Sequence, residues 1–240
     1  GEIAATQEQR KTKEGRTSPV ERIGRGAFIP SKAAEQVKNG NTENVLNYLR
    51  TQAKNKLHRA IAQVIANLKI KTKIEYVQSL PNGRLAEYDP KTDTIYVTAE
   101  GLTDSILLHE FVHAATVKVL DQYEKGNLKG LSEDQIEAAE MLEELMDRAK
   151  EDLGSRYPDA FENIFEFVSY ALTDRFFQED LAGIRLSETN RVLNTPIFPT
   201  ILPDVKSAWS SFMTGVLKLL RLEEHTSELQ SRLHLVCRLL

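Results

Sequence analysis

The sequence predicts an α+β protein that is mostly helical, with a small antiparallel or mixed sheet before one central helix. The central run, residues 102–120, is apolar on nearly all sides, as expected of a buried helix. Short segments with alternating apolar and polar residues precede it, between residues 71 and 97. Segments with helical apolar spacing lie on both sides of this region, which makes helices the majority of the chain.

The first 38 residues are polar and basic and are interrupted by glycines and prolines, so we expect residues 1–38 to form an arm or linker. A contact with an anionic partner or a processing site is an alternative, but a solvated arm is preferred. A folded domain is expected over residues 39–220. It begins with a long amphipathic helix, 43–68, in which His58 is a distant candidate for a metal ligand.

Two or three strands are expected before the central helix. Residues 71–77 and 94–97 alternate as strands do, and 87–89 is a shorter candidate. Pro81-Asn82-Gly83 marks a turn between them. An edge strand at this place could hold an extended peptide by adding it to the sheet.

The central helix carries the sequence His109-Glu110-Phe111-Val112-His113. Histidines four residues apart lie on one helix face, so both imidazoles can reach the same metal ion. In this His-Glu-x-x-His motif, the intervening Glu110 is the general base that acts on a metal-bound water. Thr103 is a suitable N-cap residue for the helix, with Asp104 in its first turn.

Further helices follow the motif. Ser132 and Gln135 form a capping box that opens a helix to about Asp152. Later helices are expected over 159–173, 175–181 and 205–220.

A catalytic zinc usually has three protein ligands, so a third must lie elsewhere. One known arrangement continues the motif from its second histidine as His-x-x-Gly-x-x-His. It is excluded here, because Thr116 and Val119 stand at the glycine and histidine positions. Glu166 is the best candidate, since a lone carboxylate is costly in the apolar helix around it unless it meets a cation. Glu162, one turn earlier, is the second choice.

These features resemble the gluzincin group of metallopeptidases, and in particular the metallopeptidase domains of large phage-encoded polyvalent proteins. The likeness covers about residues 41–177 and depends on two motifs, 107–116 and 166–173. Many gluzincins have an aspartate four residues after the ligand glutamate that supports a zinc histidine. Tyr170 stands there in this chain, and Asp174 is the nearest later acid; Asn163 and Ser169 are other candidates for this support.

The resemblance implies a zincin-like domain over residues 39–220 that hydrolyses a peptide or protein substrate, as part of a larger polyprotein. Zn²⁺ would be bound by His109, His113 and Glu166, with Glu110 as base. Tyr170, one turn after Glu166, is a candidate for stabilising the oxyanion. The alternative is a non-catalytic zincin-like module used for binding or structure.

The composition sets further expectations. With a net charge of −4 and no long basic stripe, we do not expect a nucleic-acid partner. No apolar run is long enough to span a membrane, and no signal-peptide core opens the chain. The one cysteine, Cys237, allows no internal disulfide. We therefore expect a cytoplasmic protein, in the bacterial host cytoplasm if the chain is phage-encoded.

Residues 221–240 resemble the translation of a sequencing-adapter read-through, with only Leu222 departing from the usual run. We exclude this segment from the fold prediction as a non-native tail. Its apolar residues have helical spacing, so a genuine amphipathic helix is the alternative.

Overall fold

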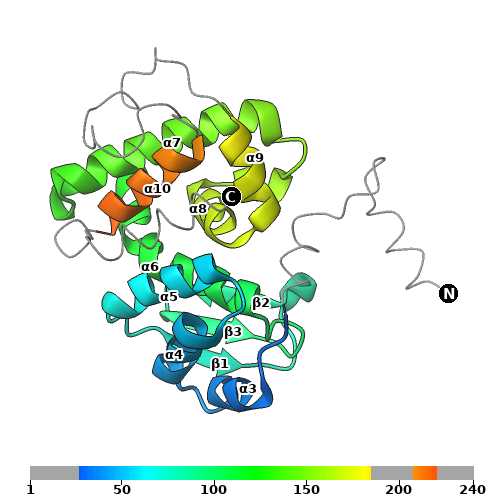
Figure 1. The fold of residues 1–240 in the computed structure, drawn as a ribbon. Helices are drawn as coiled ribbons and strands as arrows, with labels where there is room; N and C mark the ends of the chain where they lie inside the picture. Colours follow the sequence, from blue (N-terminus) through cyan, green and yellow to red (C-terminus); the bar gives the residue numbers. More distant parts are fainter. Residues whose placement is uncertain (1–26, 185–207, 221–240) are drawn as a thin grey trace.

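The computed structural model describes residues 27–184 and 208–220. Helix α6 crosses the molecule between two groups of elements (Figure 1). The sheet and helices α3 to α5 lie on one side of it, and helices α7 to α10 lie on the other. The elements in chain order are α3 (Ser31–Lys38), α4 (Thr42–Gln52), α5 (Lys56–Asn67), β1 (Lys73–Tyr76), η1 (Pro81–Gly83), β2 (Ala86–Asp89), β3 (Thr94–Val97), α6 (Asp104–Glu124), η2 (Leu128–Gly130), α7 (Glu133–Leu153), η3 (Pro158–Phe161), α8 (Ile164–Thr173), α9 (Arg175–Gly183) and α10 (Ala208–Leu219).

The sheet is mixed, and its strand order is β1-β3-β2. Strand β3 lies in the middle, parallel to β1 and antiparallel to β2. Its residues Ile95 and Val97 are fully buried, which anchors the sheet to the core. The prediction of a mostly helical α+β protein with a small sheet before the central helix is confirmed, and the mixed alternative is the one observed.

The central helix has the expected start. The side chain of Thr103 accepts a hydrogen bond from the backbone N–H of Ile106 (3.3 Å), and α6 then continues to Glu124, four residues beyond its predicted end. Leu107, Leu108 and Phe111 are fully buried along it. The capping box of Ser132 and Gln135 is also present at the start of α7.

The single helix predicted over residues 43–68 is wrong, because the chain breaks between α4 and α5. Ala53 has extended backbone angles, and the side chain of Asn55 caps the second helix by accepting from the N–H of Leu57 (2.8 Å). The freed N–H of Lys54 donates to the carboxylate of Asp104 at the start of α6 (3.2 Å). The break lets α4 and α5 pack against each other and ties both to the central helix.

Residues 27–38, which we assigned to the polar arm, are packed in the structure. Ile29, Ala33 and Val37 recur every fourth residue and are buried in the core. The N–H of Ile29 also donates to the carbonyl of Leu102, just before α6 (3.0 Å). Residues 1–26 of the expected arm, and the tail 221–240, lie outside the described residues.

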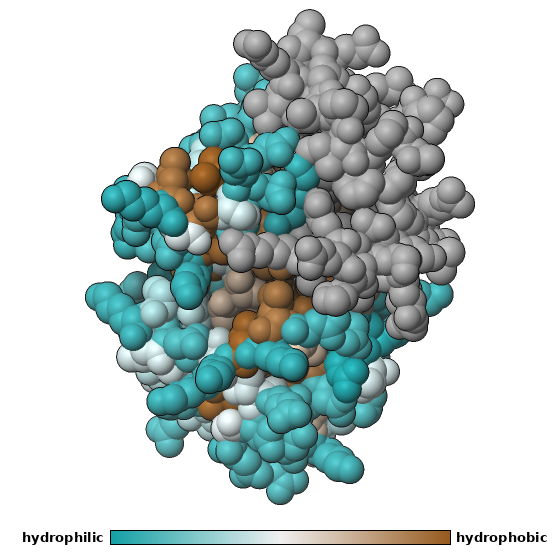
Figure 2. Space-filling view, turned by 90° about the vertical axis from the view of Figure 1, so that its left-hand side faces the viewer, coloured by the Kyte–Doolittle hydropathy of each residue, from teal (hydrophilic) through white to brown (hydrophobic). Residues whose placement is uncertain are grey.

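The helix expected over 159–173 is instead a 3₁₀ turn, η3, followed by α8, which starts at Ile164 with Asn163 as its N-cap. The other predicted helices are observed with small shifts, except that residues 205–207 lie outside the described part. Apolar side chains gather in a band on the face that looks left in Figure 1, bordered by hydrophilic surface (Figure 2). None of the helices within residues 27–184 and 208–220 has the length and apolar character that a membrane span requires.

We expect Phe111→Ala to lower the free energy of unfolding by roughly 3–5 kcal/mol, because a fully buried aromatic ring leaves a cavity when it is removed. Phe176, with 54% of its surface exposed, is the matched control, and its change to alanine should cost far less. Urea unfolding followed by circular dichroism measures both. Equal losses for the two variants would contradict the assignment of Phe111 to the core.

Candidate metal centre

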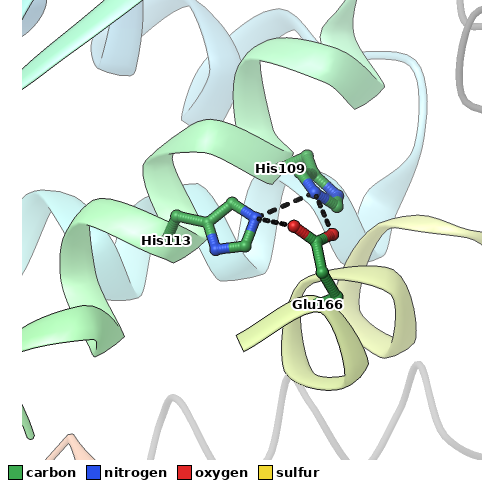
Figure 3. Close-up of side chains that lie close together, drawn as sticks. All are labelled: His109, His113 and Glu166. Carbon is green, nitrogen blue, oxygen red and sulfur yellow. Dashed lines mark hydrogen bonds and ion pairs between the residues drawn. The ribbon is translucent and has the colours of Figure 1, made fainter. Parts of the chain in front are cut away.

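The structure brings His109, His113 and Glu166 together (Figure 3). The Nε2 atoms of the two histidines are 3.0 Å apart. The Glu166 carboxylate lies 3.3 Å from Nε2 of His109 and 3.4 Å from Nε2 of His113. Among the described residues, this is the group of histidine and acidic side chains whose geometry could hold a metal ion.

The distances fit a small tetrahedral cation. Zinc lies about 2.0–2.1 Å from nitrogen and oxygen ligands, which places tetrahedral ligand atoms about 3.3 Å from one another. The three contacts of 3.0, 3.3 and 3.4 Å are close to that spacing. The two Glu166 distances involve different carboxylate oxygens, Oε2 toward His109 and Oε1 toward His113, and the three side chains together could hold a metal ion.

Local structure sets the two histidines on one face of α6. The cap at Thr103 starts this helix, and the two imidazoles then follow one turn apart. Asp104 fixes the start of the helix further, since its carboxylate accepts from the Tyr48 hydroxyl (2.9 Å) as well as from Lys54. The ring of His109 also packs edge-on against the ring of His113.

Glu166 comes from a second helix, whose start is set by Asn163. The Asn163 side chain accepts a hydrogen bond from the backbone N–H of Glu166 (2.9 Å). This places Glu166 in the first turn of α8, where the helix dipole favours a negative charge. Asn163 thus positions the ligand candidate through its backbone rather than by contacting a histidine.

Thr173 is the polar side chain that sequence reasoning missed. Its Oγ1 lies 3.4 Å from Nδ1 of His109, and its own proton is donated to the carbonyl of Ser169 (2.6 Å). The hydroxyl therefore accepts from His109, so Nδ1 carries the proton and Nε2 presents a bare lone pair to the cluster. A polar residue two turns after Glu166 in an apolar helix was the available signal.

His58, the distant candidate for a ligand, is not a member of the cluster. It is buried on α5, and its Nε2 donates to the backbone carbonyl of Thr173 (3.2 Å). Burial lowers the pKa of this imidazole, although the bond to Thr173 acts in the opposite direction. His58 thus contacts the end of α8, next to the hydroxyl that orients His109.

The electrostatics of the cluster favour a bound cation. Burial opposes ionisation of Glu166, but the neighbouring imidazoles of His109 and His113 outweigh it and hold the pKa of Glu166 well below its usual value. Burial acts to lower the pKa of His113, yet Glu166 and Glu110 raise it above its ordinary value. Two facing imidazole nitrogens can share one proton at most, so a cation between them satisfies both lone pairs.

Glu110 projects beside the cluster and is 7% exposed. Burial raises the pKa of this carboxyl, and the neighbouring histidines only partly offset the effect. The backbone of Tyr88 on strand β2 also acts to lower this pKa. Glu110 therefore lies beside the cluster of His109, His113 and Glu166 and lines the same cavity as strand β2.

The cluster opens into a cavity of about 460 Å³. Strand β2 and the preceding residues Arg84 and Leu85 form one side, and η3 with the start of α8 forms the other. Glu162, the second choice for the third ligand, lines this cavity and is outside the cluster. Tyr170 lines it too, and its ring packs edge-on against His109 with centroids 5.3 Å apart.

We expect Thr173→Val to weaken zinc binding by roughly 10–100-fold, because His109 loses the acceptor that fixes its tautomer. Thr173→Ser keeps the hydroxyl and should bind zinc with nearly unchanged affinity. Competition with a chromogenic chelator measures both constants. Equal zinc affinity of the valine variant and the unaltered protein would show that Thr173 does not orient His109.

Comparison of the chain with protein-family models, with curated proteins and with solved structures finds no match in any of the three. The functional assignment accordingly depends on the geometry of His109, His113 and Glu166, a buried group that could hold a metal ion.

Proposed function

We propose that this chain is a zinc-dependent peptidase of the gluzincin kind, which hydrolyses peptide bonds with a metal-activated water. The observation that carries the proposal is the convergence of His109, His113 and Glu166 beside Glu110, at the floor of an open cavity. A closed structural site would need four protein ligands, whereas three ligands leave a position for water. The zincin-like fold that the resemblance implies belongs to the same proposal.

The donor set supports zinc as the metal. Two imidazole nitrogens and one carboxylate oxygen suit Zn²⁺, whereas calcium and magnesium prefer oxygen ligands alone. When bound, zinc lowers the pKa of its water and polarises the scissile carbonyl. His109 and His113 would hold the ion through Nε2, and Glu166 would hold it through its carboxylate.

Glu110 would act as the general base. Its raised pKa suits a group that takes a proton from water and then passes it to the leaving amine. It lies on α6 between the two histidines in sequence, and it lines the cavity with them. A site that only held a metal would have no use for a carboxylate at this place, so an intact Glu110 favours catalysis over a purely structural module.

The edge of strand β2 could hold the substrate. The carbonyl of Leu85 accepts from the N–H of Thr98 (2.9 Å), and bonded positions alternate along an antiparallel pair. The N–H and C=O groups of Ala86 and Tyr88 therefore point away from β3 and toward the cavity. An extended peptide added along this edge would pass beside Glu110.

Tyr170 could stabilise the oxyanion. Burial, with the nearby charge of Asp159, raises the pKa of its hydroxyl above the ordinary value, so the group remains a proton donor. Its place in the cavity next to His109 puts that donor on the side of the cluster formed by α8. A hydroxyl there could donate to the negative oxygen that develops on the carbonyl.

Replacing Glu110 by glutamine should leave one zinc per chain and abolish hydrolysis, since the amide cannot take the proton. Cleavage of fluorescein-labelled casein measures activity on a foreign substrate. Mass spectrometry of the purified chain measures whether it cleaves itself. Glu162→Gln, in the same cavity but outside the cluster, is the matched control and should keep activity. Full activity of the Glu110→Gln variant would rule out the assigned base; zinc binding without any hydrolysis by the unaltered chain would favour the non-catalytic module.

Tyr170→Phe should reduce kcat by roughly 100-fold or more while KM and zinc content change little, as expected for loss of one oxyanion donor. Steady-state kinetics on a cleaved peptide separate the two parameters. An unchanged kcat would mean that Tyr170 serves only to pack against His109.

Removal of the metal with 1,10-phenanthroline should stop hydrolysis, and added Zn²⁺ should restore it. The unfolding temperature should also fall when the metal is removed, because an ion that binds only the folded state stabilises it. Activity that persists after complete removal of zinc would contradict a mechanism with a metal-activated water.

A further inference from the structure

The charges of this chain are unevenly distributed along it. Residues 27–73 contain nine lysines and arginines but only two acidic residues. Residues 132–184 contain four basic and fifteen acidic residues. The net charge of −4 therefore conceals a basic group of elements, α3 to β1, on one side of α6 and an acidic group, α7 to α9, on the other.

The basic elements form a concave surface. A groove of about 980 Å³ lies between the start of α4, the end of α5 and the segment that enters β1. The hydroxyl of Thr42 on α4 donates to the carbonyl of Thr72 (2.8 Å), which holds two sides of this groove together. We call it the basic groove; it is lined by side chains that include Arg50, Lys69, Lys71 and Lys73.

Its three lysines are exposed. Lys69, Lys71 and Lys73 are exposed, whereas Thr72 is buried. Lys69 lies in the turn after α5 with a φ of 51°, and the extended segment follows it. Alternate residues of an extended segment point to the same side and lie roughly 6.6 Å apart, so Lys71 and Lys73 are neighbours on one wall of the groove.

These cations are available to a ligand. Within the described residues, none of the three lysines forms an ion pair. Arg50 donates to the neutral side chain of Gln63 (3.1 Å), and Glu43 is the one acidic residue in the lining. The lining therefore has four basic side chains and one acidic one, and Asp93, which accepts from the Thr72 hydroxyl (2.7 Å), is a further carboxylate beside it.

The rest of the lining indicates the chemistry of the anion. It is rich in amide side chains, which together with lysine and arginine are the usual contacts to nucleic-acid phosphates and sugars; these amides are Asn39, Asn41, Asn44, Asn47, Gln63 and Asn67. None of the described residues in the lining is aromatic. Bases therefore have no ring to stack on, and the backbone is what this surface can contact.

We propose that the basic groove binds the phosphodiester backbone of a nucleic acid. Lys69, Lys71 and Lys73 would contact phosphates, and the amides would contact phosphate and sugar oxygens. The groove includes Lys73 of β1, whereas the metal cavity includes strand β2, so the two lie at opposite edges of the sheet. Binding here goes beyond the proposed peptidase function and does not depend on it.

The test uses the full chain and fluorescence anisotropy with a fluorescein-labelled 20-nucleotide single strand and the matching duplex. Affinities are measured from 50 to 200 mM NaCl, with and without zinc chelator. We compare the unaltered chain with a triple variant, Lys69→Ala, Lys71→Ala and Lys73→Ala. The matched control removes three exposed lysines outside the groove, namely Lys118, Lys125 and Lys129. Circular dichroism checks that both variants are folded.

We expect at least one of the two DNAs to bind, and the groove variant to weaken that binding at 50 mM NaCl by about tenfold or more. The slope of log K against log salt should fall in magnitude by roughly 2–3, because each lost phosphate contact contributes about 0.7–0.9. The control should bind within about twofold of the unaltered chain, and chelation should change nothing, which separates this result from the peptidase proposal.

Three results would overturn the proposal. The first is the absence of binding to either DNA at 50 mM NaCl. The second is an equal loss of affinity in the control variant, which would mean that the overall charge attracts DNA without a site. The third is displacement of the DNA by poly-L-glutamate at equal charge concentration, which would favour an acidic polypeptide as the ligand. Preference for the single strand or the duplex identifies the form of nucleic acid that the groove takes.

Discussion

The structure depends on one electrostatic constraint, which is the meeting of two imidazoles and a carboxylate inside an apolar helix pair. His109 and His113 on α6 face Glu166 on α8 at distances of 3.3 and 3.4 Å. Burying any one of these groups alone would cost free energy. Together, their charges and polar atoms offset one another or the charge of a shared cation. The packing of α8 against α6 is therefore both a core contact and the condition for the cluster.

Both ends of helix α8 contribute residues to this cluster or to its support. At its start, the Asn163 cap sets Glu166 in the first turn and aims it at the histidines. At its end, Thr173 accepts from His109 and receives a hydrogen bond from His58 on its carbonyl. The ten residues between Asn163 and Asp174 thus include Glu166, which is a member of the cluster, and Thr173, which contacts His109. Buried apolar residues such as Phe167 and Val168 hold the helix in that position.

The sequence could predict the parts of this arrangement that follow from local spacing. The histidine pair, the caps at Thr103 and Ser132, and the out-of-place carboxylate of Glu166 can each be recognised within a few residues. The break at Ala53 could not be recognised so easily, because the apolar stripe continues through it and only Asn55 gives a local signal. The packing of Val37 depends on tertiary contacts, and polar neighbours hide it in the sequence.

Long-range relations were beyond the sequence for a second reason. Thr173 accepts from His109 only because two helices from distant parts of the chain meet, so no local pattern could assign it. The net charge of −4 is likewise an average that the fold separates into basic and acidic groups of elements. The composition therefore describes the average charge of the chain but not how that charge is distributed over its surfaces.

The central claim is that one zinc ion is held by these three side chains, and anomalous diffraction at the zinc edge from crystals grown with equimolar Zn²⁺ tests it most directly. The account predicts one strong peak about 2 Å from Nε2 of His109, Nε2 of His113 and the carboxylate of Glu166. The absence of a peak there, or a single peak held by other residues, would contradict it.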